Sequence, residues 1–311
     1  EVVTPAVWRL PLPECPVVGP QQLELVVVPG GEFTIGSPEV DAGRDVYTQI
    51  RQKCEGVNVE AERKVSLKPY ALVRHPISQA QWRAVAGLPG ERDLSLTPGT
   101  YDAKGLWESH AQPGGLAVNS VSWNDSQEWL KRLNLWLAQK WPELGGKGEA
   151  PEFALPSESQ WEAACRAGRG TPFHFGDTLD ASWANYRGDY TYGPGRKGIF
   201  RQRVVSIGAF GLVNRWGLAE MHGQLNEWCA DQWHRDPLAG SAGDGSPLVG
   251  PDPEVEGPQE QTYRLLRGGS WFVNPRYARA AFRLSSHPDD LDTSVGVRPG
   301  CFSPPGLFLY T

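Results

Sequence analysis

The chain begins with two short apolar segments that have the spacing of strands. Residues 23–28 read LELVVV and are followed by the turn-forming Pro29-Gly30-Gly31, which predicts a buried strand. Residues 32–36 read EFTIG, and their alternating pattern predicts the partner strand of the first. Residues 1–22 are rich in proline and are expected to be irregular, and the polar residues 38–63 are expected to form a surface loop.

Three later segments have helical spacing, at residues 78–86, 123–136 and 155–168. The middle segment is the most regular, because its apolar residues fall on one face of a helix, at Trp129, Leu130, Leu133 and Trp136. In the other two segments a serine precedes a glutamine by three residues, which is the pattern of a capping box, in Ser78 with Gln81 and in Ser157 with Gln160. Glycines at 87 and 168 are expected to end these two helices.

Residues 170–300 contain turns, short apolar runs and aromatic residues but no further long helix. Few helices, short strands and long loops predict an α+β fold with small antiparallel sheets. Residues 265–300 are unusual, because the regular ends LLRGG and VGVRPG enclose a middle part with neither a strand period nor a helix period.

Composition restricts the possible functions. The 311 residues include 36 Gly, 27 Pro and 13 Trp, and the formal charge is −6. This acidic balance argues against nucleic acid as a partner, since nucleic-acid binding requires a basic face. The sequence has no run of 18 apolar residues, so we expect no membrane span. It starts at Glu1 with neither Met nor a visible signal peptide, and we therefore allow for a fused upstream domain.

The five cysteines are odd in number and have no C-x-x-C spacing, at Cys15, Cys54, Cys165, Cys229 and Cys301. This pattern disfavours both a disulfide framework and a structural zinc site. Free buried thiols are typical of a reducing compartment, which favours a cytoplasmic location.

Several segments, in this order, resemble blocks of the formylglycine-generating-enzyme family, also called sulfatase-modifying factors. They read VVVPGGEFTIGS, HPISQAQW, VNSVSWNDSQEWLKRL, LPSESQWEAACRAG, ANYRGDYTYG, GLAEMHGQLNEWCADQW and LLRGGSWFVNPRYARAAFR. The resemblance implies a C-type lectin fold of the formylglycine-generating-enzyme type. We expect this domain to span residues 23–303, after the irregular residues 1–22 and before a C-terminal tail at 304–311.

The chemistry implied by the resemblance depends on residues that this chain lacks. The family's oxidases hold copper with two thiolates just after the Gly-Gly-Ser block, and soft copper(I) requires such sulfur ligands. No cysteine occurs between Cys229 and Cys301, and the six histidines do not form the spaced motif of the family's iron-dependent branch. We therefore expect no copper, no iron and no enzymatic activity.

The resemblance also implies two places where the family often binds calcium. The ligands of the first would be the side chains of Glu220 and Glu227 with the carbonyls of Gly223 and Leu225, all hard oxygens that suit Ca²⁺. The second would use Asn185 and the carbonyl of Tyr186, with later carbonyls near Ile199 and Arg201. A polar turn without an ion is the alternative at both places.

One branch of the family, the variable proteins of diversity-generating retroelements, displays changeable side chains near the C-terminus. In such systems a reverse transcriptase rewrites the 3′ end of a gene at template adenines. Residues 265–300 resemble this arrangement. The framework, which would hold the backbone, consists of Arg267, Gly268, Gly269, Ser270, Trp271, Arg279, Arg283, Pro288, Asp289, Gly296 and Arg298. The displayed set, which would bind a ligand, consists of Phe272, Val273, Asn274, Tyr277, Phe282, Leu284, Ser285, Ser286, His287, Asp290, Asp292, Thr293 and Ser294.

The leading hypothesis is therefore a non-catalytic protein whose displayed set binds an unknown ligand, most simply another protein. Its mixture of aromatic and small polar residues is similar to that of antibody loops. The alternative is an undiversified relative, either catalytically dead or a divergent metal-dependent oxygenase, attached to a signalling protein.

Overall fold

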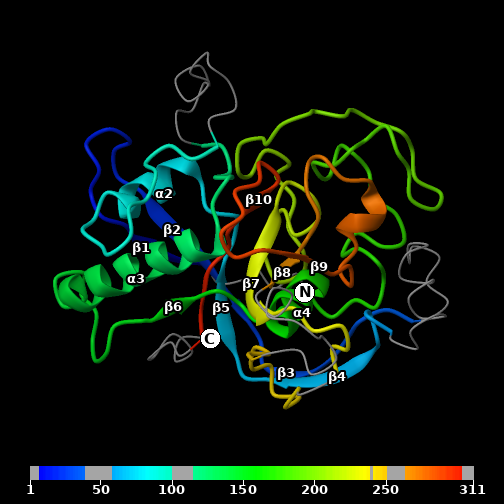
Figure 1. Cartoon of the computed structure of the whole chain (residues 1–311), viewed down its shortest axis with the longest axis horizontal. Helices are drawn as coiled ribbons and strands as arrows, with labels where there is room; N and C mark the ends of the chain where they lie inside the picture. The colour runs from blue at the N-terminus through cyan, green and yellow to red at the C-terminus, as the bar shows by residue number, and fades with distance from the viewer. Residues whose placement is uncertain (1–6, 39–57, 100–114, 239–240, 251–262, 303–311) are drawn as a thin grey trace.

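The computed structural model describes residues 7–38, 58–99, 115–238, 241–250 and 263–302. Within these residues the fold combines short helices, small sheets and long loops, as the sequence predicts (Figure 1). Helices α2 (Gln79–Ala86) and α3 (Trp123–Lys140) lie on one side, together with the first two strands. Long loops occupy the opposite side, beyond helix α4 (Glu158–Arg166).

The largest sheet joins both ends of the described chain. Its strand order is β1-β2-β5-β11-β6, and all its pairs are antiparallel. The strands are β1 (Val7–Pro11), β2 (Gln22–Val28), β5 (Tyr70–Val73), β11 (Gly300–Cys301) and β6 (Phe153–Ala154). The expectation that residues 1–22 are irregular is wrong for β1, which pairs with β2. The expected tail at 304–311 lies outside the described residues.

The second sheet carries the segment with the unusual pattern. Its order is β10-β7-β8-β9, with β10 parallel to β7 and the other pairs antiparallel. The strands are β10 (Val295–Gly296), β7 (Asn226–Gln232), β8 (Arg264–Arg267) and β9 (Leu284–Ser286). Because β8, β9 and β10 all come from residues 264–296, this sheet fixes the base of that segment (Figure 1).

A separate two-stranded sheet corrects one predicted pairing. Strand β3 (Gly31–Ile35) pairs with β4 (Arg63–Leu67) and not with β2. The predicted polar loop at 38–63 falls mostly outside the described residues, and its last residue already belongs to β4.

The predicted helices form with the expected N-caps. Ser78 and Ser157 complete capping boxes with Gln81 and Gln160, and α3 has a third box that starts at Ser122. Helix α3 is a turn longer than the sequence indicates, and α4 ends at Ala167, whose φ of 47° is left-handed. No described helix is long and apolar enough to cross a membrane.

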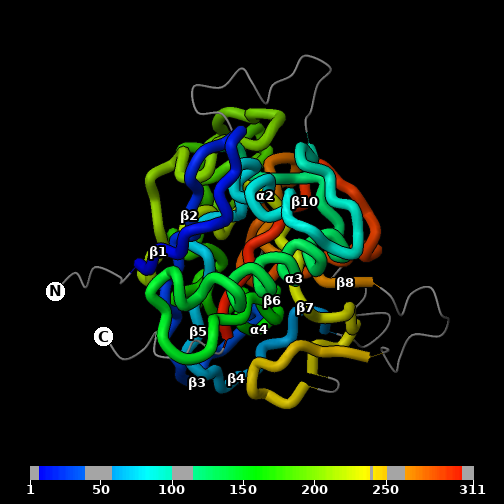
Figure 2. Tube along the Cα trace, turned by 90° about the vertical axis from the view of Figure 1, so that its left-hand side faces the viewer, coloured from blue at the N-terminus to red at the C-terminus, as the bar shows by residue number. Residues whose placement is uncertain are grey.

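Tryptophans form much of the core between the helices and the sheets. Trp82 of α2 stacks on Trp129 of α3 at 5.9 Å between ring centroids, and both rings are buried. The same cluster includes Trp228 of β7 and Leu266 of β8. Figure 2 shows α2 and α3 side by side on the near face. The second sheet is therefore held by the main core.

Buried ion pairs connect α4 to the segment after β8. Arg283 donates from Nε to Glu158 Oε1 at 2.5 Å and from Nη2 to Glu158 Oε2 at 3.1 Å. Its Nη1 donates to the carbonyls of Val59 and His234. Burial alone would raise the pKa of Glu158, but the charges of Arg283, Arg267 and Arg63 outweigh it and lower the pKa to about 2. Glu158 is thus a buried anion whose stability depends on these arginines.

A buried histidine supports the same segment through backbone contacts. His222 Nδ1 lies 2.7 Å from the Ala278 carbonyl, and its Nε2 accepts from the His174 amide at 2.9 Å. This pattern fixes a neutral ring with the proton on Nδ1. Burial lowers the pKa of His222 well below its usual value and that of His174 to about 4. Both histidines are therefore structural.

Replacing Arg283 with methionine should lower the free energy of unfolding by about 3 kcal/mol, because the buried Glu158 loses its closest partner and keeps only the longer contacts to Arg63 and Arg267. Arg9 pairs with Glu24 through a side chain that is 65% exposed, and Arg9→Met should cost less than about 1 kcal/mol. Urea unfolding followed by tryptophan fluorescence measures both variants. Equal losses would contradict the role assigned to Arg283.

Acid should weaken the fold through His174. The unfolded chain takes up this proton near pH 6.5, but the folded chain does so only near pH 4. The stabilisation is therefore fully present above pH 6.5 and is lost as the pH falls towards 4. Between pH 6.5 and 5, the unfolding free energy of His174→Gln should fall by about 2 kcal/mol less than that of the unmodified protein. Urea titrations of both proteins at pH 6.5 and pH 5 measure this difference. If the variant and the unmodified protein lose the same unfolding free energy between these pH values, the role assigned to His174 is wrong.

Candidate binding surface

The displayed set lies at the surface, as the sequence predicts. All thirteen side chains are exposed or half-buried, and none is buried. Phe272 is 56% exposed and Leu284 is 37% exposed, although both are apolar. By contrast, the framework residues Arg267, Arg279, Arg283 and Arg298 are buried beneath them. Most framework positions are buried and alternate with outward positions along the same segment, but Pro288 is half-buried and Asp289 is exposed, so the framework prediction is wrong for Asp289.

Arg267 holds the backbone of this segment from below. Its Nη1 donates to the carbonyls of Ala281 at 2.9 Å and Phe282 at 2.6 Å, and its Nη2 donates to that of Ala280 at 2.6 Å. Nη2 also donates to Glu162 of α4, which balances the charge. The planar guanidinium can make these bonds together because its donors are fixed in direction. The contacts involve main-chain oxygens, so they do not depend on which side chains follow.

Arg279 and the glycine pair fix the next part of the segment. Arg279 donates to both oxygens of Glu60, at 2.8 and 2.9 Å. Gly268 and Gly269 have φ of 99° and 72°. A Cβ on Gly269 would lie 2.6 Å from the Tyr277 carbonyl. The chain therefore needs glycine there, both for the left-handed turn and for the close backbone approach.

Contacts to the start of α3 anchor the far end of the displayed segment. Trp271 Nε1 and Asn119 Nδ2 both donate to the Thr293 carbonyl, at 3.0 and 2.8 Å. The Ser120 amide donates to the carbonyl of Asp292 at 3.1 Å. The backbone is thus tied down on both sides of the exposed residues.

Some displayed side chains also stabilise local turns. Asn274 Oδ1 accepts from the Arg276 amide, and Asp292 Oδ1 accepts from the Ser294 amide. Asp290 Oδ2 accepts from the Ser286 hydroxyl and the His287 amide. These three positions therefore have a structural role in addition to the predicted one.

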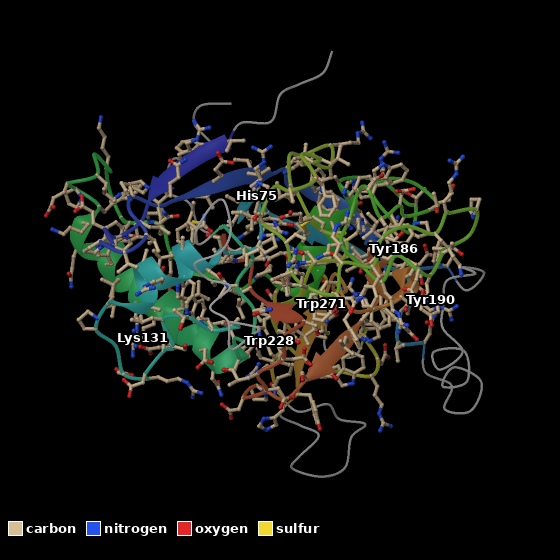
Figure 3. All side chains as sticks on the ribbon, turned by 90° about the horizontal axis from the view of Figure 1, so that it is seen from above. His75, Lys131, Tyr186, Tyr190, Trp228 and Trp271 are labelled. Carbon is tan, nitrogen blue, oxygen red and sulfur yellow. The ribbon has the colours of Figure 1, made fainter. Side chains whose placement is uncertain are left out.

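A second loop lies against the displayed segment, and the sequence-based site prediction missed it. The Arg187 amide donates to the Val273 carbonyl at 2.9 Å, and Phe200 and Val204 pack in one cluster with Trp271. Figure 3 places Tyr186 and Tyr190 on the same side of Trp271, with Lys131 far away on the other side. Residues 187–203, named here the basic loop, thus contribute to the surface. Their only signal in the sequence was the density of cations and aromatic residues.

Three of the four groups predicted as ligands at the first calcium place have other partners. Both oxygens of Glu227 accept from Arg298, and Oε2 also accepts from Trp161 Nε1 at 2.7 Å. Glu220 instead accepts from the Gly208 amide and faces His75. The Gly223 carbonyl accepts from the amide of Leu225, whose side chain is buried. A guanidinium already occupies the Glu227 carboxylate, so this group does not fit calcium.

The second predicted calcium place keeps one candidate ligand. Asn185 is buried, and its Nδ2 donates to the carbonyl of Arg203 and to Gln224 Oε1. Its Oδ1 is buried without a hydrogen-bond partner, which suits a cation ligand. Tyr186 is also buried, and its side-chain hydroxyl donates to the Leu179 carbonyl. The predicted calcium ligand is a different group of this residue, the main-chain carbonyl of Tyr186. Calcium binding here stays a prediction.

The cysteines do not supply the copper chemistry implied by the resemblance. Cys165 and Cys229 are buried, and burial raises the pKa of both thiols, with nearby carboxylates adding to the effect. Cys301 is buried in β11, and Cys54 lies outside the described residues. Over the described ranges, His, Cys, Asp and Glu side chains form no group of three that could hold a metal ion. The residues present therefore do not fit a dithiolate copper centre.

Curated relatives are similar along most of the chain. Hercynine oxygenase of Mycolicibacterium smegmatis is 26% identical over 88% of this chain, which spans 60% of that protein's length. Formylglycine-generating enzyme of Thermomonospora curvata is 26% identical, covering 92% of this chain and 96% of the relative. Inactive C-alpha-formylglycine-generating enzyme 2 of Bos taurus is 24% identical, and the similarity covers 92% of this chain and 91% of the relative.

Two solved structures share the fold. PvdO from Pseudomonas aeruginosa superposes with a TM-score of 0.65 and 22% identity, covering 96% of this chain and 99% of that one. Variable protein 1 of Treponema denticola gives a TM-score of 0.61 and 19% identity, covering 96% of this chain and 100% of that one. These likenesses confirm the predicted fold, a C-type lectin fold of the formylglycine-generating-enzyme type.

The relatives correct one prediction. The inference that the chain is not an enzyme is wrong as a general conclusion, because relatives with similarity along most of the chain are named as an oxygenase and a formylglycine-generating enzyme. The absence of the thiolate pair argues only against the copper-dependent oxidase reaction and not against other enzymatic activities. The Sulfatase-modifying factor enzyme 1-like domain matches residues 16–299. The chain therefore belongs to this family of sulfatase-modifying-factor-like domains.

Proposed function

We propose that this domain binds a ligand, most simply another protein, through the thirteen side chains of the displayed set. The observation that carries the proposal is the alternation along residues 265–300: the framework arginines are buried, and every displayed side chain reaches the surface. A segment built only for packing would bury most of its large apolar residues, yet Phe272 and Leu284 face outward.

The way the segment is anchored supports a surface with changeable side chains. Arg267 contacts three carbonyls, and the carbonyls of Asp292 and Thr293 contact the loop before α3. Main-chain groups are the same for every residue type, so these bonds survive side-chain replacement. The fold can therefore present different residues on one backbone.

The chemistry of the displayed set also suits recognition. Tyr277 and Phe282 lie with their ring centroids 4.9 Å apart, and Phe272 packs edge-on against Trp271 at 5.5 Å. Large rings offer contact area with little loss of conformational freedom, and the neighbouring Ser285 and Ser286 offer adaptable hydrogen bonds. A few such aromatic residues can carry most of a binding energy.

We further propose that the displayed positions are diversified in the gene. Adenine replacement in an asparagine codon can produce all residue types of the displayed set, but not Lys, Glu, Gln, Met or Trp, and none of these five occurs there. This chain also shares its fold with variable protein 1 of Treponema denticola, which supports the proposal only as far as the fold is concerned.

Sequencing this gene from independent isolates tests the proposal. Differences should be concentrated at the thirteen displayed codons, because their side chains face outward while main-chain contacts hold the segment. Codons for Arg267, Arg279, Arg283 and Arg298 should not vary, since each guanidinium has a buried partner. Lys, Glu, Gln, Met and Trp should stay absent from the displayed positions. Differences spread evenly over all exposed residues, or found at the four arginines, would refute the proposal.

A further inference from the structure

The basic loop concentrates positive charge beside the displayed segment. It contains five cations and a single acidic residue, Asp189, although the whole chain has a charge of −6. Arg187 pairs with Asp189 through an exposed ion pair at 3.2 Å. The other four cations form no ion pair with any described carboxylate: Arg196, Lys197, Arg201 and Arg203. The loop thus carries an excess of positive charge at the surface. Besides the hydrogen bonds from Ser182, the charge of Arg196 helps to lower the pKa of Asp180.

These cations contrast with the arginines beneath the displayed segment. Arg267, Arg279, Arg283 and Arg298 each have a buried carboxylate partner. Arg196, Lys197 and Arg203 are exposed instead, and the half-buried Arg276 within the displayed segment also lacks an ion pair with a described residue. The paired arginines serve the fold, and the unpaired ones are free to contact a partner.

Aromatic rings restrict the direction of two of the guanidiniums. Arg187 lies over the rings of Tyr190 and Phe200, at 4.8 and 5.5 Å from their centroids. Arg201 lies over Phe210 at 5.1 Å. The edge of the Arg187 guanidinium already donates to Asp189, and a competing carboxylate would have to replace that exposed contact. Arg201 Nη1 is buried without a hydrogen-bond partner, so its ring contact only fixes the position of its positive charge. A side chain held in place before binding also loses less conformational freedom when a partner arrives.

Apolar area accompanies this charge. Ile199 is 67% exposed and Tyr190 is 42% exposed, both within the basic loop. Phe272 is exposed next to the point where the Arg187 amide meets the Val273 carbonyl. Arginine with aromatic residues is the combination enriched in protein interfaces. The partner should therefore offer both carboxylates and apolar side chains.

We propose that the partner is a protein that places an acidic segment, rich in Asp and Glu with an apolar residue between them, on the basic loop beside Phe272. This inference rests on the proposed function and assigns the chemistry of its ligand. The other end of the displayed segment carries exposed Asp289, Asp290 and Asp292. A phosphate backbone that crossed the whole surface would meet these carboxylates, so nucleic acid fits less well than a protein whose acidic part is local.

The test measures fluorescence anisotropy of labelled probes with the purified full chain in low salt. The main probe is a twelve-residue peptide of Asp, Glu and Tyr, and its matched control has Asn and Gln in place of the acids. An oligothymidylate with the same number of charges serves as the nucleic-acid probe. Sedimentation with phosphatidylserine vesicles serves as the membrane probe. The acidic peptide should bind at least about tenfold more tightly than its neutral control, and added salt should weaken it.

Two triple variants locate the binding. Arg196→Gln, Lys197→Gln and Arg203→Gln together should weaken binding of the acidic peptide about tenfold, since three exposed charges are lost. The control triple is Lys131→Gln, Lys140→Gln and Lys147→Gln, which removes the same charge from the exposed Lys131 and Lys147 and the half-buried Lys140, on α3 and just beyond it. It should change the affinity less than twofold. Unchanged unfolding midpoints establish that both variants are folded.

Several outcomes would overturn the inference. These are equal binding of acidic and neutral peptides, equal effects of the two triple variants, tighter binding of the oligothymidylate than of the acidic peptide, or binding to vesicles without binding to the peptide. Sequencing the gene from independent isolates tests the proposed function separately from these binding experiments. If it holds while the acidic peptide fails to bind, the proposed function stands and only the assigned chemistry falls.

Discussion

The buried guanidinium of Arg267 is the contact on which the displayed segment depends. Removing a charge from water is expensive, so the folded chain must supply both an anion and hydrogen-bond acceptors. Glu162 of α4 supplies the anion, and the carbonyls of residues 280–282 supply the acceptors. The chain after β8 can satisfy Arg267 only by keeping that backbone course. Together with the contact of Arg267 to Glu158, these bonds help to define an otherwise irregular segment.

The same principle recurs around the segment and separates framework from surface. Arg279 binds Glu60, Arg283 binds Glu158, and Arg298 binds Glu227. Each carboxylate comes from a part of the chain distant in sequence. Outward side chains such as Leu284 and Ser285 carry none of these contacts. Structure is thus maintained from inside, while the outer face remains exposed.

Local signals in the sequence predicted the helices well and the sheets less well. Capping boxes at Ser78 and Ser157 involve residues three apart, so the sequence alone reveals them. The pairing of β1 with β2, and of β3 with β4, depends on contacts across loops, and the prediction missed both. Gly168 was expected to end α4, but Ala167 takes the left-handed conformation one residue earlier.

The candidate site shows the same division. Exposure of the displayed set followed from its pattern and the family resemblance. The partners of the framework arginines lie about 70 to 220 residues away, so they could not be inferred. The family resemblance implied calcium at Glu227, whereas the structure pairs that carboxylate with Arg298. The basic loop was missed because its aromatic and cationic residues follow no period, and only the fold brings Arg187 to Val273.

One comparison of unfolding free energies tests most directly whether the segment is held from inside. A fivefold variant changes only outward residues: Phe272→Ser, Val273→Thr, Leu284→Asn, Ser285→Tyr and Thr293→Asn. The unfolding free energy of this variant should lie within about 1 kcal/mol of that of the unmodified protein, because no side-chain hydrogen bond within the described residues is lost. Arg267→Met alone should cost about 3–5 kcal/mol. A fivefold variant as unstable as Arg267→Met would contradict the account.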